Sequence, residues 1–142
     1  MGTRVLRATS SDPMLRAYAH CSADHGGATA MLLIHLDPSM PRTVLVDGLG
    51  LPQPLHDNAS GSGTMTEWHL TGPNGLNATQ MALNGKLLVA KIVAGGTEYD
   101  LPSLDGRITP MQQEDNGSIS VEMAPASIAF VELDTPSGVC SP

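Results

Sequence analysis

Aromatic residues are scarce in this chain of 142 residues, which has one Trp, two Tyr and one Phe. Any folded core must therefore be built mainly from Leu, Val, Ile, Met and Ala. Long apolar runs are also missing. No segment approaches the roughly 18 consecutive apolar residues that a membrane span needs, and this excludes a transmembrane helix. Met1 is followed by GTRVLRATSSDP, which has no apolar core, so a secretory signal peptide is not predicted.

Basic residues are few as well, with seven Lys and Arg against fourteen Asp and Glu, for a net charge of −7. Nucleic-acid binding requires clustered basic side chains, so this class of function is excluded. Direct capture of polyanionic sugars is disfavoured for the same reason, because like charges repel at long range. The acidic residues are scattered and are interpreted as a solvated surface.

The length fits one domain, which we assign to residues 1–142. Short apolar runs alternate with turn-forming clusters about every 10 residues, a spacing typical of an all-β sandwich or barrel. Eleven prolines and fifteen glycines would interrupt helices. We predict an antiparallel β-sandwich of about eight or nine strands, at residues 3–9, 14–21, 28–36, 42–48, 64–71, 79–84, 86–90, 118–123 and 127–133.

Alternation and turn residues support these strands. Residues 14–21 place apolar side chains on one face and Arg16, Tyr18 and His20 on the other. Residues 127–133 are mostly apolar on both faces, as expected for a central strand. Asn84-Gly85 predicts a type I′ hairpin turn, since both central residues of that turn need a positive φ. The stretches 48–63 and 91–117 are predicted to be rich in loops.

The two cysteines, Cys21 and Cys140, lie near opposite ends of the chain. They could form one long-range disulfide or remain as two reduced thiols in a cytosolic protein. Three N-x-S/T triplets, at Asn58, Asn77 and Asn116, lie in or beside predicted loops where a glycan would reach solvent. Together with a possible bridge, these triplets favour a secreted origin over a cytosolic one.

No catalytic, metal or cofactor site is recognised in the chain. The five histidines lack metal-ligand spacing, no serine lies in a G-x-S-x-G turn, and the glycine-rich stretches lack the context of phosphate-binding loops. Glu67 is expected to be solvent-facing or paired. Trp68 is the best candidate for a sugar-stacking residue, although packing in the sandwich core or against another domain is the favoured interpretation.

Several motifs, in order, resemble the C-terminal β-domain of heparanase-like proteins, glycoside hydrolase family 79. The segment 2–21 is similar to that family's G-T-[KR]-V-L followed by L-R-x-Y-x-H-C. The segment EWHLTGPNGLNATQMALNGKLL (67–88) is similar to a strand-turn-hairpin pattern that is closest to the plant branch. LPSLDG (101–106), MAPASIAFVEL (123–133) and the final VC (139–140) continue the resemblance over nearly the whole chain.

The resemblance implies several properties that the residues alone do not. In the family, the cysteines that match Cys21 and Cys140 form a disulfide. The two catalytic glutamates lie on a preceding (β/α)₈ barrel, and the glutamates of this chain match neither of them: Glu67, Glu98, Glu114, Glu122 and Glu132. The family's β-domain also takes at least one strand from residues before the barrel. Met1 is then expected to be an internal methionine, and the chain a C-terminal fragment or truncated product.

Two functions follow as hypotheses. The first is an accessory, non-catalytic domain of a heparanase-like β-glucuronidase, with the barrel as its partner. The full-length parent would be secreted or would reside in a lysosome or vacuole, with membrane association left open. The second is a free-standing β-sandwich that binds a carbohydrate, through Trp68, or a protein. A fragment without any independent role is a third possibility.

Overall fold

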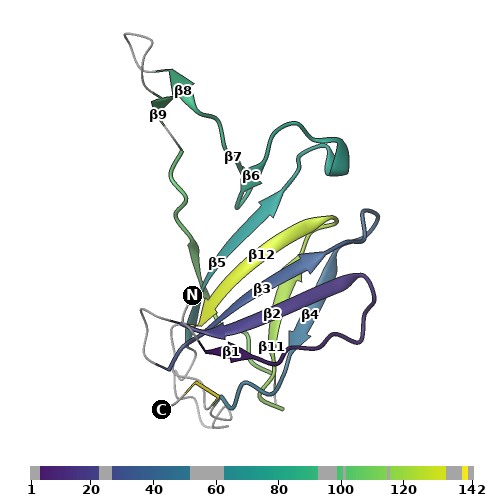
Figure 1. Ribbon diagram of the computed structural model, residues 1–142, viewed down its shortest axis with the longest axis vertical. Helices are drawn as coiled ribbons and strands as arrows, with labels where there is room; N and C mark the ends of the chain where they lie inside the picture. The colour runs from purple at the N-terminus through teal and green to yellow at the C-terminus, as the bar shows by residue number, and fades with distance from the viewer. Residues whose placement is uncertain are drawn as a thin grey trace.

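The computed structural model describes residues 4–22, 27–51, 63–92, 99–100, 102–114, 116–133 and 139–140. These residues form an all-β, antiparallel fold with one short 3₁₀ helix (Figure 1). The strands are β1 (Val5–Leu6), β2 (Leu15–Cys21), β3 (Thr29–His35), β4 (Arg42–Val46), β5 (Thr64–Thr71), β6 (Ala82–Leu83), β7 (Lys86–Leu87), β8 (Lys91–Ile92), β9 (Tyr99–Asp100), β10 (Arg107–Pro110), β11 (Ile119–Met123) and β12 (Ser127–Leu133); the helix η1 is Gly75–Asn77.

One large sheet has the order β1-β2-β3-β12-β5-β6-β7. The strand β10 belongs to the same sheet and pairs with the first half of β5. A second sheet, made of β4 and β11, lies behind it in Figure 1. The strand β12 is central, because it pairs with β3 on one side and with β5 on the other. The predicted all-β sandwich is therefore confirmed, and each of the nine predicted segments contains a strand.

The core lies between the two sheets and is aliphatic. It consists of alternate residues of the large sheet packed against β4, β11 and neighbouring loops: Met31, Leu33, Val44, Leu49, Leu51, Met65, Met111, Ile119, Val121, Met123, Ala129, Val131 and Leu133. Strands supply the period of two that places these side chains on a single face. None of these core residues is aromatic, which agrees with the scarcity of aromatic residues in the sequence.

The predicted hairpin turn is also confirmed. Asn84 and Gly85 have φ values of 49° and 79°, so the hairpin between β6 and β7 has the two positive φ angles of a type I′ turn. The Asn84 side chain also extends the pairing with β5, since its Oδ1 accepts the His69 N–H at 2.9 Å. Its Nδ2 donates to the Glu67 carbonyl at 3.1 Å.

The sequence prediction missed three strands, all within the stretch 91–117 that was expected to be rich in loops. Among the described residues, the strands β8 and β9 pair only with each other. The strand β10 pairs with β5 in the register Arg107↔Glu67. It ends at Pro110 and follows a glycine, so its own residues carry a weak strand signal. Its formation depends on β5, about 40 residues earlier in the chain.

Leu133→Ala tests whether the two-layer core carries the stability. Leu133 is fully buried, so we expect a loss of about 2–5 kcal/mol in the free energy of unfolding, from lost burial and the cavity left behind. Leu45→Ala is the matched control, because Leu45 is 62% exposed, and it should change stability by less than about 0.5 kcal/mol. Urea unfolding followed by circular dichroism measures both. Equal losses in the two variants would contradict the assigned core.

Candidate functional site

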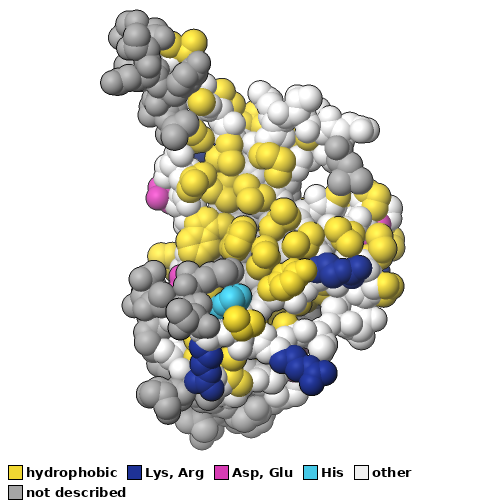
Figure 2. Space-filling view, viewed as in Figure 1, with side chains coloured by type: hydrophobic (Ala, Val, Ile, Leu, Met, Phe, Trp, Pro, Cys, Tyr) yellow, Lys and Arg dark blue, Asp and Glu magenta, His cyan; other side chains and the backbone are white. Residues whose placement is uncertain are grey.

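The outer face of the large sheet, which points away from the core, is also apolar. Cross-strand partners lie on the same face, and the register places Tyr18, Leu32, Phe130 and Trp68 in one row across β2, β3, β12 and β5. A neighbouring row contains Ile34, Ile128 and Leu70. Figure 2 shows hydrophobic side chains gathered over these strands. We call this surface the outer apolar face.

The aromatic residues are concentrated on this outer face rather than in the core. Tyr18 is 51% exposed and Phe130 is 37% exposed, while Trp68 is half-buried between them and a loop. The chain has only four aromatic residues, and three of them lie here. Trp68 therefore does not pack in the sandwich core. The arrangement is the reverse of an ordinary domain, in which large aromatic side chains anchor the interior.

The outer face is hollowed beside Trp68. A pocket of about 420 Å³ is lined mainly by apolar side chains of Trp68, Leu70, Leu83, Leu104 and Phe130. Glu132 and Ser22 contribute polar groups to the lining, and the Ser22 hydroxyl donates a hydrogen bond to the Glu132 carboxylate. A pocket of this composition suits an apolar group with few hydrogen-bonding requirements.

Trp68 is held by the loop that precedes β10. Its indole Nε1–H donates to the Leu104 carbonyl at 2.9 Å. A Cβ at Gly106 would lie 2.7 Å from Cε2 of the indole, so only glycine allows the backbone to lie this close to the ring. Leu104 thus occupies the indole N–H group, which could otherwise donate to a sugar hydroxyl, and Gly106 covers part of the ring.

Glu67, the residue before Trp68, points to the opposite face and is 4% exposed. Its Oε2 accepts hydrogen bonds from the Arg107 guanidinium at 3.0 Å and from the Thr109 hydroxyl at 3.1 Å. Its Oε1 lies 3.4 Å from His69 Nε2. We call these four residues the Glu67 cluster. Glu67 was expected to be solvent-facing or paired, and the structure shows that it is buried and paired.

The electrostatics of the Glu67 cluster indicate a structural role. Burial on its own would raise the pKa of the Glu67 carboxyl, but the interactions with His69, Arg107 and Thr109 outweigh it and lower the pKa to about 2. The general acid of a glycosidase needs the opposite shift, because it must hold a proton near neutral pH. Glu67 is therefore unsuited to donate a proton to a leaving group.

The structure describes three further glutamates, Glu114, Glu122 and Glu132. Glu122 accepts a hydrogen bond from the Thr43 hydroxyl at the surface, and Glu132 accepts one from the Ser22 hydroxyl. Glu114 is exposed. Glu98 lies outside the described residues. Among the described residues, no three His, Cys, Asp or Glu side chains gather as metal ligands would. In the same ranges, no helix is long and apolar enough to cross a membrane.

The described histidines belong to the sheet. His35 is buried in β3, with its Nδ1 2.9 Å from the Ala124 carbonyl. His20 is on β2, and His69 belongs to the Glu67 cluster. His25 and His56 lie outside the described residues.

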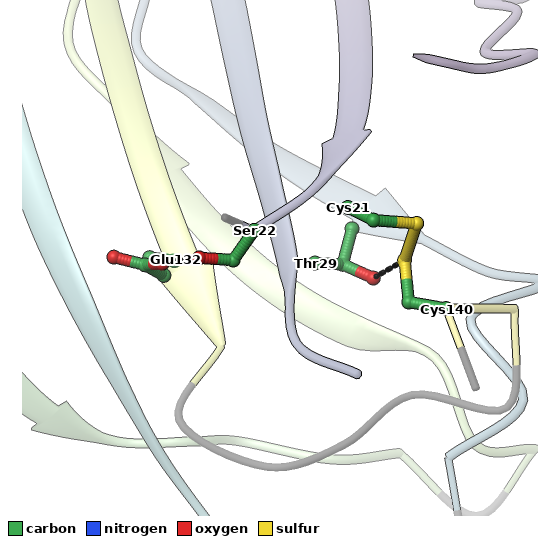
Figure 3. The surroundings of a disulfide bond; sticks show 5 residues. All are labelled: Cys21, Ser22, Thr29, Glu132 and Cys140. Carbon is green, nitrogen blue, oxygen red and sulfur yellow. Dashed lines mark hydrogen bonds between the residues drawn. A yellow bond between two sulfur atoms is a disulfide. The ribbon is translucent and has the colours of Figure 1, made fainter. Parts of the chain in front are cut away.

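Cys21 and Cys140 form a disulfide, with Cα atoms 5.5 Å apart and a sequence separation of 119. Figure 3 shows the bridge at the end of β2, where the Thr29 hydroxyl contacts Cys140 Sγ at 3.4 Å. The bridge fastens the C-terminal end of the chain to the large sheet. Of the two alternatives for the cysteines, the structure therefore shows the long-range bridge rather than two reduced thiols.

Of the three triplets, Asn77 and Asn116 are exposed on connecting segments, and Asn58 lies outside the described residues. Asn77 ends η1, between β5 and β6, and Asn116 lies between β10 and β11. Neither belongs to a strand of the outer apolar face. Their modification stays a prediction.

Glu67→Gln tests the cluster. Removing the charge weakens its hydrogen bonds, and we expect a loss of about 1.5–3 kcal/mol at pH 7. The folded-state pKa is lowered from 4.5 to about 2, so the carboxylate stabilises the fold above pH 4.5, and that stability disappears as the pH falls toward 2. The difference between the two proteins should shrink over this window.

The emission of Trp68, the only tryptophan, follows unfolding in both proteins. Glu122→Gln is the control, because Glu122 is an exposed glutamate that also accepts a cross-strand hydroxyl, and it should change stability by less than about 0.5 kcal/mol. A Glu67→Gln protein whose loss is the same at pH 2.5 and pH 7 would contradict the assigned ionisation.

Replacing both cysteines by serine tests the bridge. A closed loop of 119 residues corresponds to about 4–5 kcal/mol in the chain-entropy treatment, which sets the upper end of the expected loss. Mass analysis before and after reduction detects the bond, and urea unfolding measures its effect. The double variant should be insensitive to reductant, whereas the native chain should lose stability. A native chain equally stable with and without reductant would refute this role.

Comparisons with known proteins support a relationship over most of the chain. No protein-family profile matches it. Heparanase-like protein 1 of Arabidopsis thaliana is 34% identical over 156 aligned positions, which cover 94% of this chain and 26% of that protein. The chain therefore spans about a quarter of the length of this relative. The similarity supports a heparanase-like relationship.

One solved structure supports the fold. CelM2, a bifunctional glucanase-xylanase from a metagenome library, shares 13% identity with a TM-score of 0.51 over 94% of this chain and 18% of that protein. The GH51 arabinofuranosidase of Xanthomonas axonopodis pv. citri is 18% identical over 93% of this chain and 21% of its own chain, with a TM-score of 0.47. The first match supports the β-architecture alone.

Proposed function

We propose that this chain is the accessory C-terminal β-domain of a heparanase-like β-glucuronidase of glycoside hydrolase family 79. In this proposal the domain is not catalytic and packs its outer apolar face against a catalytic (β/α)₈ barrel. The parent would hydrolyse β-linked glucuronides. The sequence similarity to heparanase-like protein 1 supports the relationship, and its restriction to 26% of that protein fits a single domain of a larger one.

The observation that carries the proposal is the placement of the aromatic residues. The core of the sandwich is aliphatic, whereas Tyr18, Phe130 and Trp68 share the outer face. Aromatic side chains are enriched at the centres of protein interfaces and depleted from free surfaces. Large exposed apolar patches of this kind mark interaction sites. A partner that covers this face would supply the burial that the chain itself does not.

A second feature also fits a domain that is completed by other residues. The two-stranded β4–β11 sheet opposes a much larger sheet, and no described strand pairs with the other edge of β4. A hollow of about 490 Å³ lies between β4 and the inner faces of β2 and β3. Leu15, Ala17 and Ala19 on the inner face of β2 are only half-buried. A strand from residues before the barrel, placed beside β4, would cover them.

The carbohydrate-binding alternative is less well supported. Trp68 lies beside a pocket, but its indole N–H is already bonded to Leu104 and its ring is partly covered by Gly106. Sugar platforms need an accessible ring face and nearby hydrogen-bonding groups. The apolar lining of the pocket fits a protein side chain better. A secreted or lysosomal or vacuolar parent is part of the proposal, supported by the disulfide.

Phe130→Asp in the full-length product of the extended reading frame tests docking. A buried charge at the domain interface should lower secreted yield and β-glucuronidase activity together by tenfold or more, because an unpaired buried carboxylate is strongly disfavoured. Leu45→Asp is the matched control, since Leu45 is exposed on the second sheet, and it should leave both near the native level. The chain of 142 residues alone should not hydrolyse a chromogenic β-glucuronide.

Three outcomes would overturn the proposal. One is an upstream reading frame without a barrel that carries paired glutamates. Another is turnover by the purified 142-residue chain that survives removal of contaminants. The third is a Phe130→Asp protein as active and as abundant as the native one. Glycan binding by the isolated domain that Trp68→Ala abolishes without unfolding it would instead favour the free-standing carbohydrate binder.

A further inference from the structure

We propose that Asn77 and Asn116 each accept an N-linked oligosaccharide, Asn77 before or after the domain folds, and Asn116 only before its turn closes. The inference rests on the disulfide, on the two triplets and on their geometry, and it does not depend on a catalytic barrel. A disulfide places the chain in an oxidising compartment. In eukaryotic cells such a compartment also contains the enzyme that transfers oligosaccharides to N-x-S/T triplets.

The chemistry sets the requirements for each site. The asparagine Nδ2 attacks the anomeric carbon of a lipid-linked oligosaccharide, a C–N bond forms, and the bond to the lipid diphosphate breaks. The proton lost from Nδ2 passes to a base of the transferring enzyme. The enzyme must also reach the Ser or Thr hydroxyl two residues later. An acceptor triplet therefore has to be accessible at both its first and its third residue.

The Asn77 triplet meets these requirements in the folded domain. Asn77 and Thr79 are both exposed, and neither side chain is hydrogen-bonded to a described residue. Between them, Ala78 leaves the 3₁₀ helix with φ −68° and ψ 131°, which is extended backbone. The triplet thus presents its amide and its hydroxyl on an open segment, so transfer does not require the domain to unfold.

The Asn116 triplet is different, because its third residue is buried. Ser118 is 2% exposed, and its hydroxyl donates to Asn116 Oδ1 at 2.6 Å. The Ser118 N–H donates to the same oxygen at 3.0 Å, and the Ser118 carbonyl accepts the Glu114 N–H at 2.8 Å. The next residue, Ile119, begins β11 and is fully buried in the core. Once this turn has closed, the hydroxyl is out of reach of an enzyme.

A glycan on Asn116 is nevertheless compatible with the folded turn. The oligosaccharide is attached to Nδ2, whereas both hydrogen bonds that Asn116 accepts from Ser118 use Oδ1. The Asn116 side chain is exposed, so the sugar would extend into solvent. The folded structure leaves room for a glycan on Asn116. Modification there therefore depends on whether transfer occurs before the turn closes. Folding and transfer compete at Asn116 and do not compete at Asn77.

Translation of the signal-peptide-tagged chain into eukaryotic microsomes, with and without dithiothreitol, tests this difference. The reductant prevents the Cys21–Cys140 bond and delays folding. Occupancy is measured for each site by peptide mass mapping after enzymatic deglycosylation. We expect both sites to carry glycan, Asn116 only in part without reductant, and occupancy at Asn116 to rise at least twofold with reductant. Occupancy at Asn77 should stay constant. The double variant Cys21→Ser with Cys140→Ser should reproduce the effect of the reductant.

Variants assign each glycan to its triplet. Thr79→Ala and Ser118→Ala should each remove one glycan while leaving the asparagine in place. Asn74→Gln is the control, because Asn74 is exposed, lies three residues from Asn77 and belongs to no triplet, so the glycan pattern should not change. A chain with either site empty under both conditions contradicts the proposal. So does an Asn116 occupancy that the reductant leaves unchanged, or an Asn77 occupancy that rises equally.

Discussion

The structure depends on a sheet that is apolar on both faces, of which the described chain covers only one. In β12, Ala129, Val131 and Leu133 pack into the core, while Ile128 and Phe130 point outward. Burial of apolar surface is the main driving force of folding, so the β4–β11 layer suffices to define the sandwich. The same force acts on the uncovered face, and its aromatic row makes that face suited to a partner rather than to water.

The strand β5 connects the two faces. Its consecutive residues Glu67 and Trp68 point in opposite directions, and each contacts the segment that leads into or forms β10. On the inner side, Glu67 holds Arg107 and Thr109. On the outer side, Trp68 donates to Leu104 and packs beneath Gly106. The buried carboxylate therefore helps to hold the segment that forms one wall of the outer pocket, and this gives a structural reason for a buried charge on β5.

The disulfide, the two described N-x-S/T triplets and the aromatic residues of the outer apolar face lie in different parts of the domain. The disulfide anchors the end of the chain at β2, and the two described triplets lie on connecting segments. The aromatic row lies on β2, β3, β12 and β5, which carry none of these triplets. A domain built in this way can be solvated and glycosylated at its loops while one sheet face remains available for apolar packing.

Much of the fold could be predicted from the sequence, because alternation and turn chemistry are local. The two apolar faces of residues 127–133, the Asn84-Gly85 turn and the nine strand segments all follow from neighbouring residues. The pairing of Cys21 with Cys140 followed from family resemblance. The tertiary structure alone decided which face is covered, that β10 forms, that Glu67 is buried, and that the Trp68 N–H is occupied. The last three of these features depend on contacts between residues about 36 to 42 positions apart, as from Trp68 to Leu104 and from Glu67 to Thr109, and no local pattern encodes such contacts.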